Sequence, residues 1–200
     1  MPKVTQEYME ARRRQILDAA RRCFLRDGFH STSMQDLFAE SGLSAGAVYR
    51  HFASKNEMIT AIVEESMRDV LTMVHGVAGQ RPTSSVGDLM AGVFDIVKAK
   101  TAEQNIAGLS VLAWSESLRN PSLAEQFNDL LAQMRSALTE VVREHQQGGT
   151  LTRGASPEAI AATLLCTLPG YILHLAMGDS EAVEGVPDAL RALWPEAAPS

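Results

Sequence analysis

A run of three polar residues, Tyr-Arg-His at positions 49–51, could form hydrogen bonds with another molecule. The apolar residues on either side, Val48 and Phe52, are four positions apart and would share the buried side of a helix, so the polar side chains would point into solvent. The residues at 45–47 are small, which makes the first turn of that helix slim. A slim first turn followed by hydrogen-bonding side chains suits a helix that reads base edges in the major groove of DNA.

The residues from Thr32 to Phe52 predict the two short helices that would hold this surface in place. Thr32 and Gln35 have the spacing of a capping box and would begin the first helix. Gly42 falls where a left-handed residue would end it, and Ser44 would cap the second helix, which runs to about Phe52. Two helices joined by a short glycine-containing turn form a helix-turn-helix.

Two further helices flank this pair. Glu10 to Asp27 has apolar residues at helical spacing, and residues 1–9 before it are expected to form a frayed arm. The Arg12-Arg13-Arg14 run lies near the exposed side of that helix and would be either a solvated face or a set of phosphate contacts. A second capping box begins a helix at Ser54 that could continue to about His75.

The second half of the chain predicts helix after helix. Residues 76–85 form a loop, and the Asn-Pro and Ser-Pro pairs farther on are signals for helix starts. The predicted helices span residues 85–100, 103–118, 121–147, 157–177 and 187–194. We therefore expect an all-α protein of about nine helices, with a three-helix DNA-binding domain at 1–53 and a helical bundle at 54–200.

Composition and charge agree with a mildly basic DNA-binding domain joined to a more acidic second domain. The 200-residue chain is 46% hydrophobic with a net charge of −6, which argues against non-specific coating of nucleic acid. Residues 1–60 hold nine Lys and Arg against seven acids, whereas the remainder holds nine against seventeen. Cys23 and Cys166 fit a reducing compartment. With no signal sequence and no apolar stretch near the ~18 residues of a membrane helix, we expect a soluble, cytoplasmic protein.

Catalytic and metal chemistry find little support in the sequence. The five histidines have no metal-ligand spacing with one another or with the cysteines. The sequence has neither a glycine-rich phosphate loop after a strand nor a nucleophile elbow. We expect no catalytic residues, no metal and no cofactor.

The first sixty residues resemble the TetR family of bacterial transcriptional regulators. The matching text is ILDAARRCFLRDGFHSTSMQDLFAESGLSAGAVYRHFASKNEM, which combines a helix ending in Gly-Phe, the Ser-Gly-Leu-Ser turn and the Gly-Ala-Val-Tyr segment. The rest of the chain matches only in layout, as a helical bundle that in this family holds an effector pocket and the dimer interface.

The resemblance implies DNA contacts at the matching positions. Phosphates would be held by Thr32, Ser33, Tyr49 and Lys55; the major groove would be approached by Ser44, Ala45, Gly46 and Ala47; and Arg50 or His51 would reach bases or phosphate. Many family members carry lysine and threonine where this chain has alanine at 45 and 47. Contact with a thymine methyl group, the arginine at 50 and DNA shape would therefore carry more of the sequence reading.

The second domain offers candidates for an effector pocket and a dimer face. The pocket candidates are rings and a methionine in helical apolar stripes, for which ordinary core packing is the alternative. They are Phe94, Trp114, Phe127, Met134, Tyr171 and His174. The homodimer face is assigned to the last two helices, through Leu164, Leu168, Ile172, Leu190 and Leu193.

These features favour a transcriptional repressor that binds a palindromic double-stranded DNA operator as a homodimer and leaves it when a small-molecule effector binds. An effector lodged against the helix from Ser54 would tilt that helix and move Lys55, and the DNA-binding domain with it. Two alternatives stay open. One is a DNA-binding activator or architectural protein without a pocket, and the other is a helical interaction module or enzyme that needs no operator.

Overall fold

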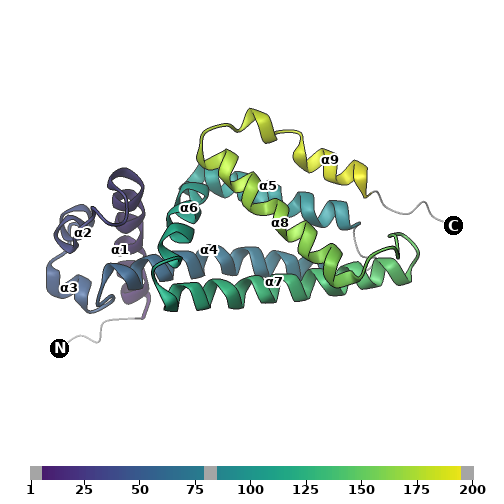
Figure 1. Cartoon of the computed structure of the whole chain (residues 1–200). Coiled ribbons are helices and arrows are strands. Elements are labelled where there is room, and N and C mark those ends of the chain that lie inside the picture. Colours follow the sequence, from purple (N-terminus) through teal and green to yellow (C-terminus); the bar gives the residue numbers. More distant parts are fainter. Residues whose placement is uncertain (1–5, 79–84, 195–200) are drawn as a thin grey trace. The chain divides into compact units, whose positions relative to one another are not determined.

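The computed structural model describes residues 6–78 and 85–194, apart from the side chains of residues 67, 69–71 and 73–78. Within these ranges the regular structure is nine α-helices and one short 3-10 helix, with no strand (Figure 1), which confirms the all-α prediction. The helices are α1 (Gln6–Asp27), α2 (Met34–Ser41), α3 (Ala45–Tyr49), α4 (Lys55–Ala78), α5 (Val86–Gln104), α6 (Ile106–Ser117), α7 (Pro121–Gln147), α8 (Pro157–Ala176), η1 (Glu181–Val183) and α9 (Val186–Leu193).

The chain divides into two compact units, Met1–Glu65 and Ser66–Ser200, called the head and the body below. Helix α4 runs through the boundary between them. The division that the sequence suggests, between residues 53 and 54, stays a prediction.

The head is built around apolar side chains from its four helical segments. Ile16 and Phe24 of α1, Leu37 of α2, Val48 of α3 and Met58 of α4 are all at most 1% exposed. Helix α1 begins at Gln6, so the arm predicted for residues 1–9 is wrong for 6–9, and its residues 1–5 lie outside the described ranges. The Gln6 amide donates to the Glu10 carboxylate one turn on, at 3.1 Å, a pair that adds a small stabilisation to this end of the helix.

The helix-turn-helix has the predicted order with shifted ends. Ser33, not Thr32, is the N-cap of α2, and its partner in the capping box is Asp36. Gly42 ends α2 in the left-handed region at φ 66°, as predicted. The predicted cap at Ser44 is also present, but α3 ends at Tyr49 rather than near residue 52.

The body surrounds one apolar core. Helix α8 packs against α5, α6 and α7, and α9 packs against α5 (Figure 1). The core includes Leu89 and Phe94 of α5, Met134 of α7 and Leu164 of α8. Packing against these helices buries Ala161, Leu164, Leu168, Tyr171 and Ile172 of α8.

The body's helix ends follow local signals where these are strong. The Asn-Pro and Ser-Pro pairs begin α7 and α8 as predicted. Asn105, in the left-handed region at φ 50°, both ends α5 and caps α6, so α5 extends past the predicted end at residue 100. Helix α4 reaches Ala78, so the loop predicted for 76–85 is wrong for residues 76–78, and its residues 79–84 lie outside the described ranges.

Helix α9 lies so close to α5 that residue 87 must be glycine. A Cβ atom on Gly87 would lie 2.4 Å from the carbonyl oxygen of Leu190 and 2.7 Å from that of Trp194. Beside this approach, Arg191 of α9 binds the carboxylate of Asp95 in α5 at 2.8 Å. Backbone contact and an ion pair together hold the last helix to the body.

The prediction that no apolar stretch is long enough for a membrane helix is wrong for α8. Among the described residues this helix is long and apolar enough to span a membrane by length and composition, with a mean hydropathy of 1.7. It also supplies Leu164, Leu168 and Tyr171 to the core, as a core helix of a soluble protein would. Only 33% of its apolar window is buried, so many of its apolar side chains lie on an outer side.

Candidate nucleic-acid interface

Helix α3 presents its small first turn to solvent. Ser44 accepts a hydrogen bond from the N–H of Ala47 at 3.3 Å, and Ala45 and Gly46 are exposed. Val48 is fully buried and fixes the other side of the helix in the head. Because only Cβ-sized groups or smaller project from positions 45–47, another molecule can approach this backbone closely.

The polar residues at the end of α3 differ in their surroundings. Tyr49 is 51% exposed, although its ring packs edge-on against Phe38 with centroids 5.5 Å apart. Arg50 is exposed. His51 is half-buried, and this burial, with the positive charges of Arg13 and Arg50, lowers its pKa. A neutral imidazole offers one donor and one acceptor at neutral pH.

The two hydroxyls before α2 lie differently from each other. Thr32 is 1% exposed, and its hydroxyl donates to the carbonyls of Gly28 at 2.8 Å and Cys23 at 3.4 Å. Ser33 is exposed and donates to the Asp36 carboxylate at 2.7 Å. The Thr32 hydroxyl therefore points into the head, contrary to the predicted capping role, and Ser33 is the hydroxyl at the surface.

Lys55 was expected to hold phosphate through its ammonium group. In the structure Nζ donates instead to three carbonyl oxygens, those of Phe29 at 2.8 Å, His30 at 3.1 Å and Thr32 at 2.9 Å. These carbonyls belong to the turn between α1 and α2. No local sequence pattern indicates this contact, because the donor and its acceptors are separated by more than twenty residues.

Glu65 joins α4 to α1 within the head. Its carboxylate binds Arg13 at 2.9 Å and Arg21 at 2.7 Å. Arg13 also lies over the ring of Phe52, 5.0 Å from its centroid. Arg13, one member of the Arg12–Arg14 run, is therefore bound by a carboxylate within the head. This contact with Glu65 was not predicted from the sequence.

Glu40 of α2 joins that helix to α1 in the same manner. It binds Arg22 at 2.6 Å and Arg26 at 3.1 Å. Hydrogen bonds from Arg22 and then Arg26 hold the pKa of Glu40 below its usual range. Much of the basic charge counted near the N-terminus thus orients helices within the head.

Two of the predicted pocket residues stack in the body's core. The rings of Phe94 and Tyr171 lie 4.5 Å apart and 14° from parallel. Tyr171 is 3% exposed, and its phenol oxygen is buried without a hydrogen-bond partner. Burial raises the pKa of this phenol. An unsatisfied buried hydroxyl is uncommon in folded proteins.

The other four pocket candidates are less uniform. Phe127 and Met134 are buried, and Trp114 packs partly buried against the same core as the stacked rings. His174 is exposed and its ring bonds the Asp179 carboxylate at 3.1 Å, so it faces away from the core. The pocket that these six residues were expected to form stays a prediction.

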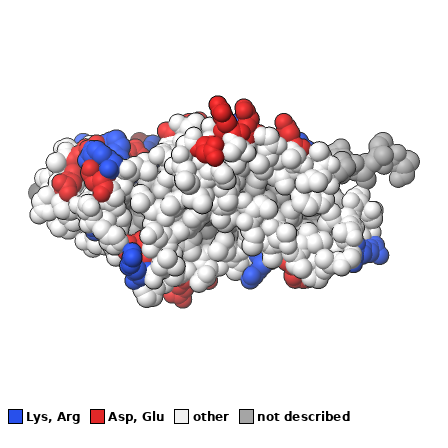
Figure 2. Space-filling model, turned by 45° about the horizontal axis from the view of Figure 1, so that its top comes forward, with Lys and Arg blue, Asp and Glu red and all other residues white. Residues whose placement is uncertain are grey.

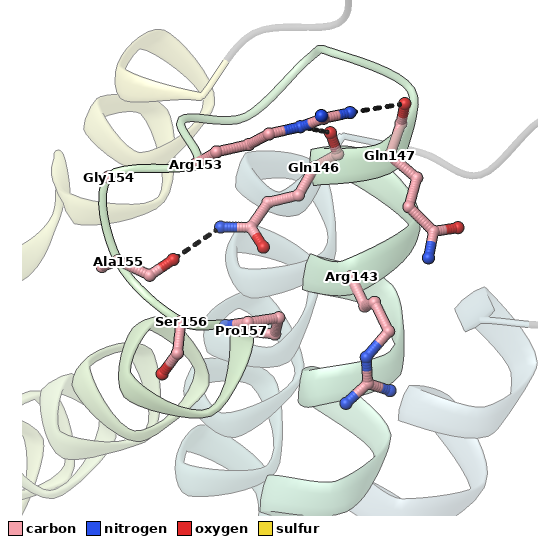
Figure 3. A pocket seen from close by; sticks show the side chains of 8 residues that line it. All are labelled: Arg143, Gln146, Gln147, Arg153, Gly154, Ala155, Ser156 and Pro157. Atoms are coloured by element: carbon pink, nitrogen blue, oxygen red, sulfur yellow. Dashed lines mark hydrogen bonds between the residues drawn. The ribbon is translucent and has the colours of Figure 1, made fainter.

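A hollow of about 420 Å³ lies elsewhere in the body, between the end of α7 and the start of α8 (Figure 3). Arg153 crosses it and donates to the carbonyls of Gln146 at 2.9 Å and Gln147 at 3.3 Å. Arg143, also in its lining, binds the carboxylates of Glu140 and Glu158. None of the predicted pocket residues lines this hollow, and its two guanidinium groups are engaged within the protein.

The dimer residues predicted on the last two helices lie on both sides of those helices. Leu193 is 68% exposed. The other four are buried in the core of a single chain, at 1–9% exposure, so they were wrongly placed on an outer face: Leu164, Leu168, Ile172 and Leu190. The apolar residues that are exposed on α8 and at its end include Leu173 at 46% and Met177 at 75%.

The head's geometry defines a helix-turn-helix DNA-binding protein: two capped helices, a left-handed glycine between them, and an exposed second helix. The chain belongs to the tetR family of bacterial regulatory proteins, whose family model matches residues 16–62. Residues 88–194 match the model of the C-terminal region of BetI-type transcriptional repressors. No group of three or more possible metal ligands occurs among the described residues.

Individual relatives and solved structures agree with this assignment. The chain is 28% identical over 180 residues to the HTH-type transcriptional repressor Rv1474c of Mycobacterium tuberculosis, covering 90% of each protein. It superposes on Salmonella enterica GusR with a TM-score of 0.74 and 27% identity, covering 96% of this chain and 99% of that one. SmeT in its triclosan complex shares the fold, with a TM-score of 0.73, 23% identity, and coverage of 95% and 100%. The chain is thus similar to transcriptional regulators rather than to enzymes.

Proposed function

We propose that this transcriptional regulator is a cytoplasmic repressor without catalytic activity, which binds a palindromic operator as a homodimer and releases it when a small-molecule effector binds. The observation that supports DNA binding best is α3. Its small first turn is exposed, its inner side is held by a buried valine, and hydrogen-bonding side chains follow at its end. One such helix makes few contacts, so a second copy is needed for a specific site.

The proposed DNA contacts are those groups of the head that reach its surface. Arg50 reads a base edge, Tyr49 and Ser33 bond phosphates, and His51 contributes at the edge of the interface. The α3 turn enters the major groove with Ser44, Ala45, Gly46 and Ala47. The hydroxyl of Thr32 and the ammonium of Lys55 are left out of this set because they are bonded inside the head.

Selection of bound sequences from a random DNA pool tests the proposal. A two-fold symmetric motif is expected, and Arg50→Ala should weaken binding to it by about 1–3 kcal/mol and relax one position of the motif. Arg14→Ala removes an exposed arginine of α1 and serves as the matched control, because it should leave the motif unchanged. Recovery of no common motif would contradict the proposal.

We place the dimer contact on the outer side of α8. Cys166, Gly170, Leu173 and Met177 are exposed and recur at helical spacing along that side. Figure 2 shows a face of the body whose middle carries no Lys, Arg, Asp or Glu, and Glu158 is the only such residue in α8. A continuous apolar surface on a helix favours association of two copies about a two-fold axis.

The buried phenol of Tyr171 supports an effector site in the body. A ligand that bonds this oxygen would be a largely apolar molecule, ring-bearing or chain-like, with one hydrogen-bonding group. The test is a panel of such compounds added to the operator complex, with Tyr171→Phe as the variant that loses the response. If no compound alters operator affinity, the alternative of an activator or architectural protein without a pocket is favoured.

A further inference from the structure

We propose that Lys55 is a positioning residue for DNA recognition, which fixes the start of α2, and that its ammonium group does not bind phosphate. The inference rests on the proposed DNA binding. Its basis is the set of three hydrogen bonds from Nζ to the carbonyls of Phe29, His30 and Thr32, at 2.8–3.1 Å.

The ammonium group is saturated by these contacts. A lysine has three N–H donors, and each of them has a carbonyl acceptor here. The ring of Phe29 lies beside the same charge, with its centroid 4.8 Å from Nζ. Binding a phosphate would require Lys55 to give up at least one of these bonds and leave a carbonyl of the turn without its donor.

The lysine connects two helix starts that are far apart in the sequence. It occupies the first position of α4, whereas its acceptors lie in the turn that precedes the N-cap of α2. The same turn is held from the other side by the Thr32 hydroxyl, which donates to the carbonyl of Gly28 at 2.8 Å. The turn is thus bonded both to α1 and to α4, and it sets where α2 begins.

The position of α2 matters for DNA recognition because α3 follows it after a three-residue turn. Helix α2 carries Phe38, against which Tyr49 of α3 packs. A shift of α2 would therefore move the phenol of Tyr49 and the neighbouring guanidinium of Arg50 relative to the base edges of the DNA. Specific binding would weaken, because it needs these side chains at fixed positions against the bases. Non-specific binding would not weaken, because it depends on counterion release.

The variant Lys55→Gln distinguishes a positioning role from a phosphate contact when operator affinity is measured at several salt concentrations. The matched control is Lys98→Gln, which removes the same charge from α5 in the body. We expect Lys55→Gln to lower operator affinity by about tenfold or more. Its affinity for random-sequence DNA and the slope of log affinity against log salt should equal those of Lys98→Gln, and Lys55→Arg should restore part of the operator affinity.

A slope reduced by about 0.9, with weaker binding to all DNA, would show a phosphate contact and overturn the inference. Operator affinity equal to that of Lys98→Gln would overturn it as well.

Hydrogen exchange in the free protein gives a reading that needs no operator. The N–H of Thr32 bonds the carbonyl of Gly28 at 3.2 Å within the turn. Lys55→Gln should speed exchange at this amide and through the first turn of α2, with no change in the body. Unchanged exchange would overturn the inference even if the operator is known. Failure to find any operator, with exchange still accelerated, would contradict the proposed function alone.

Discussion

The contacts between helices inside the head differ in kind from those inside the body. In the head, Glu65 and Glu40 each bind two arginines of α1, and Lys55 binds three carbonyls. In the body, one cluster of buried apolar side chains, which includes Leu164 and Phe94, joins helices α5 to α9. Polar contacts fix directions and apolar contacts fill volume. The head thus combines its apolar core with charged and polar contacts of defined geometry between helices, whereas the apolar core of the body is joined by fewer such contacts in this comparison, among them the Arg191–Asp95 ion pair.

The largest effect is expected in the body's core. Leu164→Ala removes a side chain that is 1% exposed and should lower the free energy of unfolding by about 2–5 kcal/mol. Chemical denaturation followed by circular dichroism measures this change. Thr163→Ala, on the adjacent exposed position, is the control and should change stability by less than about 0.5 kcal/mol. Equal losses for the two variants would mean that this side of α8 is not the buried one.

The next effect concerns the outer side of the same helix. Leu173→Glu should leave the single chain folded but weaken dimerisation by at least about thirtyfold, because a charge would have to be buried in the contact. Sedimentation velocity over a range of concentrations gives the dimer dissociation constant. Leu131→Glu changes another leucine, on α7, that is 42% exposed. If that control dissociates the dimer and the first variant does not, the contact lies on another face.

A smaller effect is expected from the ion pairs of the head. Glu65→Gln removes the carboxylate shared by two arginines, whose side chains are 38% and 13% exposed. Because all three groups are partly solvated, the loss should be about 1 kcal/mol and should shrink at high salt. Denaturant unfolding at low and high salt measures it, with the exposed neighbour Glu64→Gln as the control. A loss that is independent of salt would contradict an electrostatic origin.

The smallest effect is a pH dependence at His51. Burial and two nearby arginines lower its pKa in the folded head, so the unfolded chain binds the proton more readily. Stability should therefore fall as the pH drops below about 6.5 and stop falling once the lowered folded-state pKa is passed. His51→Gln should flatten this part of the profile, which denaturant unfolding at a series of pH values measures. A profile unchanged by this variant would rule out His51 as its source.

The features that the sequence predicts well depend on neighbouring residues. Gly42 and Ser44 act within their own turn, so the end of α2 and the start of α3 are visible in the pattern. The start of α2 was misplaced by one residue because Thr32 with Gln35 and Ser33 with Asp36 both fit a capping box. Only tertiary packing, which buries Thr32, decides between them.

The features that were missed depend on distant residues. Lys55 meets carbonyls 23 to 26 positions earlier, and no local pattern encodes that contact. In α8, apolar residues occur all around the helix, so periodicity could not tell Leu168, which faces the core, from Leu173, which does not. The predicted dimer residues Leu164, Leu168 and Ile172 therefore face the core of a single chain, and the location of the dimer contact stays a prediction.

The two cysteines give the protein a built-in reporter. Cys23 is 0% exposed in α1, and burial raises the pKa of its thiol, whereas Cys166 is exposed on the outer side of α8. A thiol-reactive dye added to the native protein should thus mark a single position per chain. Since that position lies in the proposed contact between two copies, the labelling rate should rise on dilution. Assembly can then be followed in the unaltered protein, without an engineered tag.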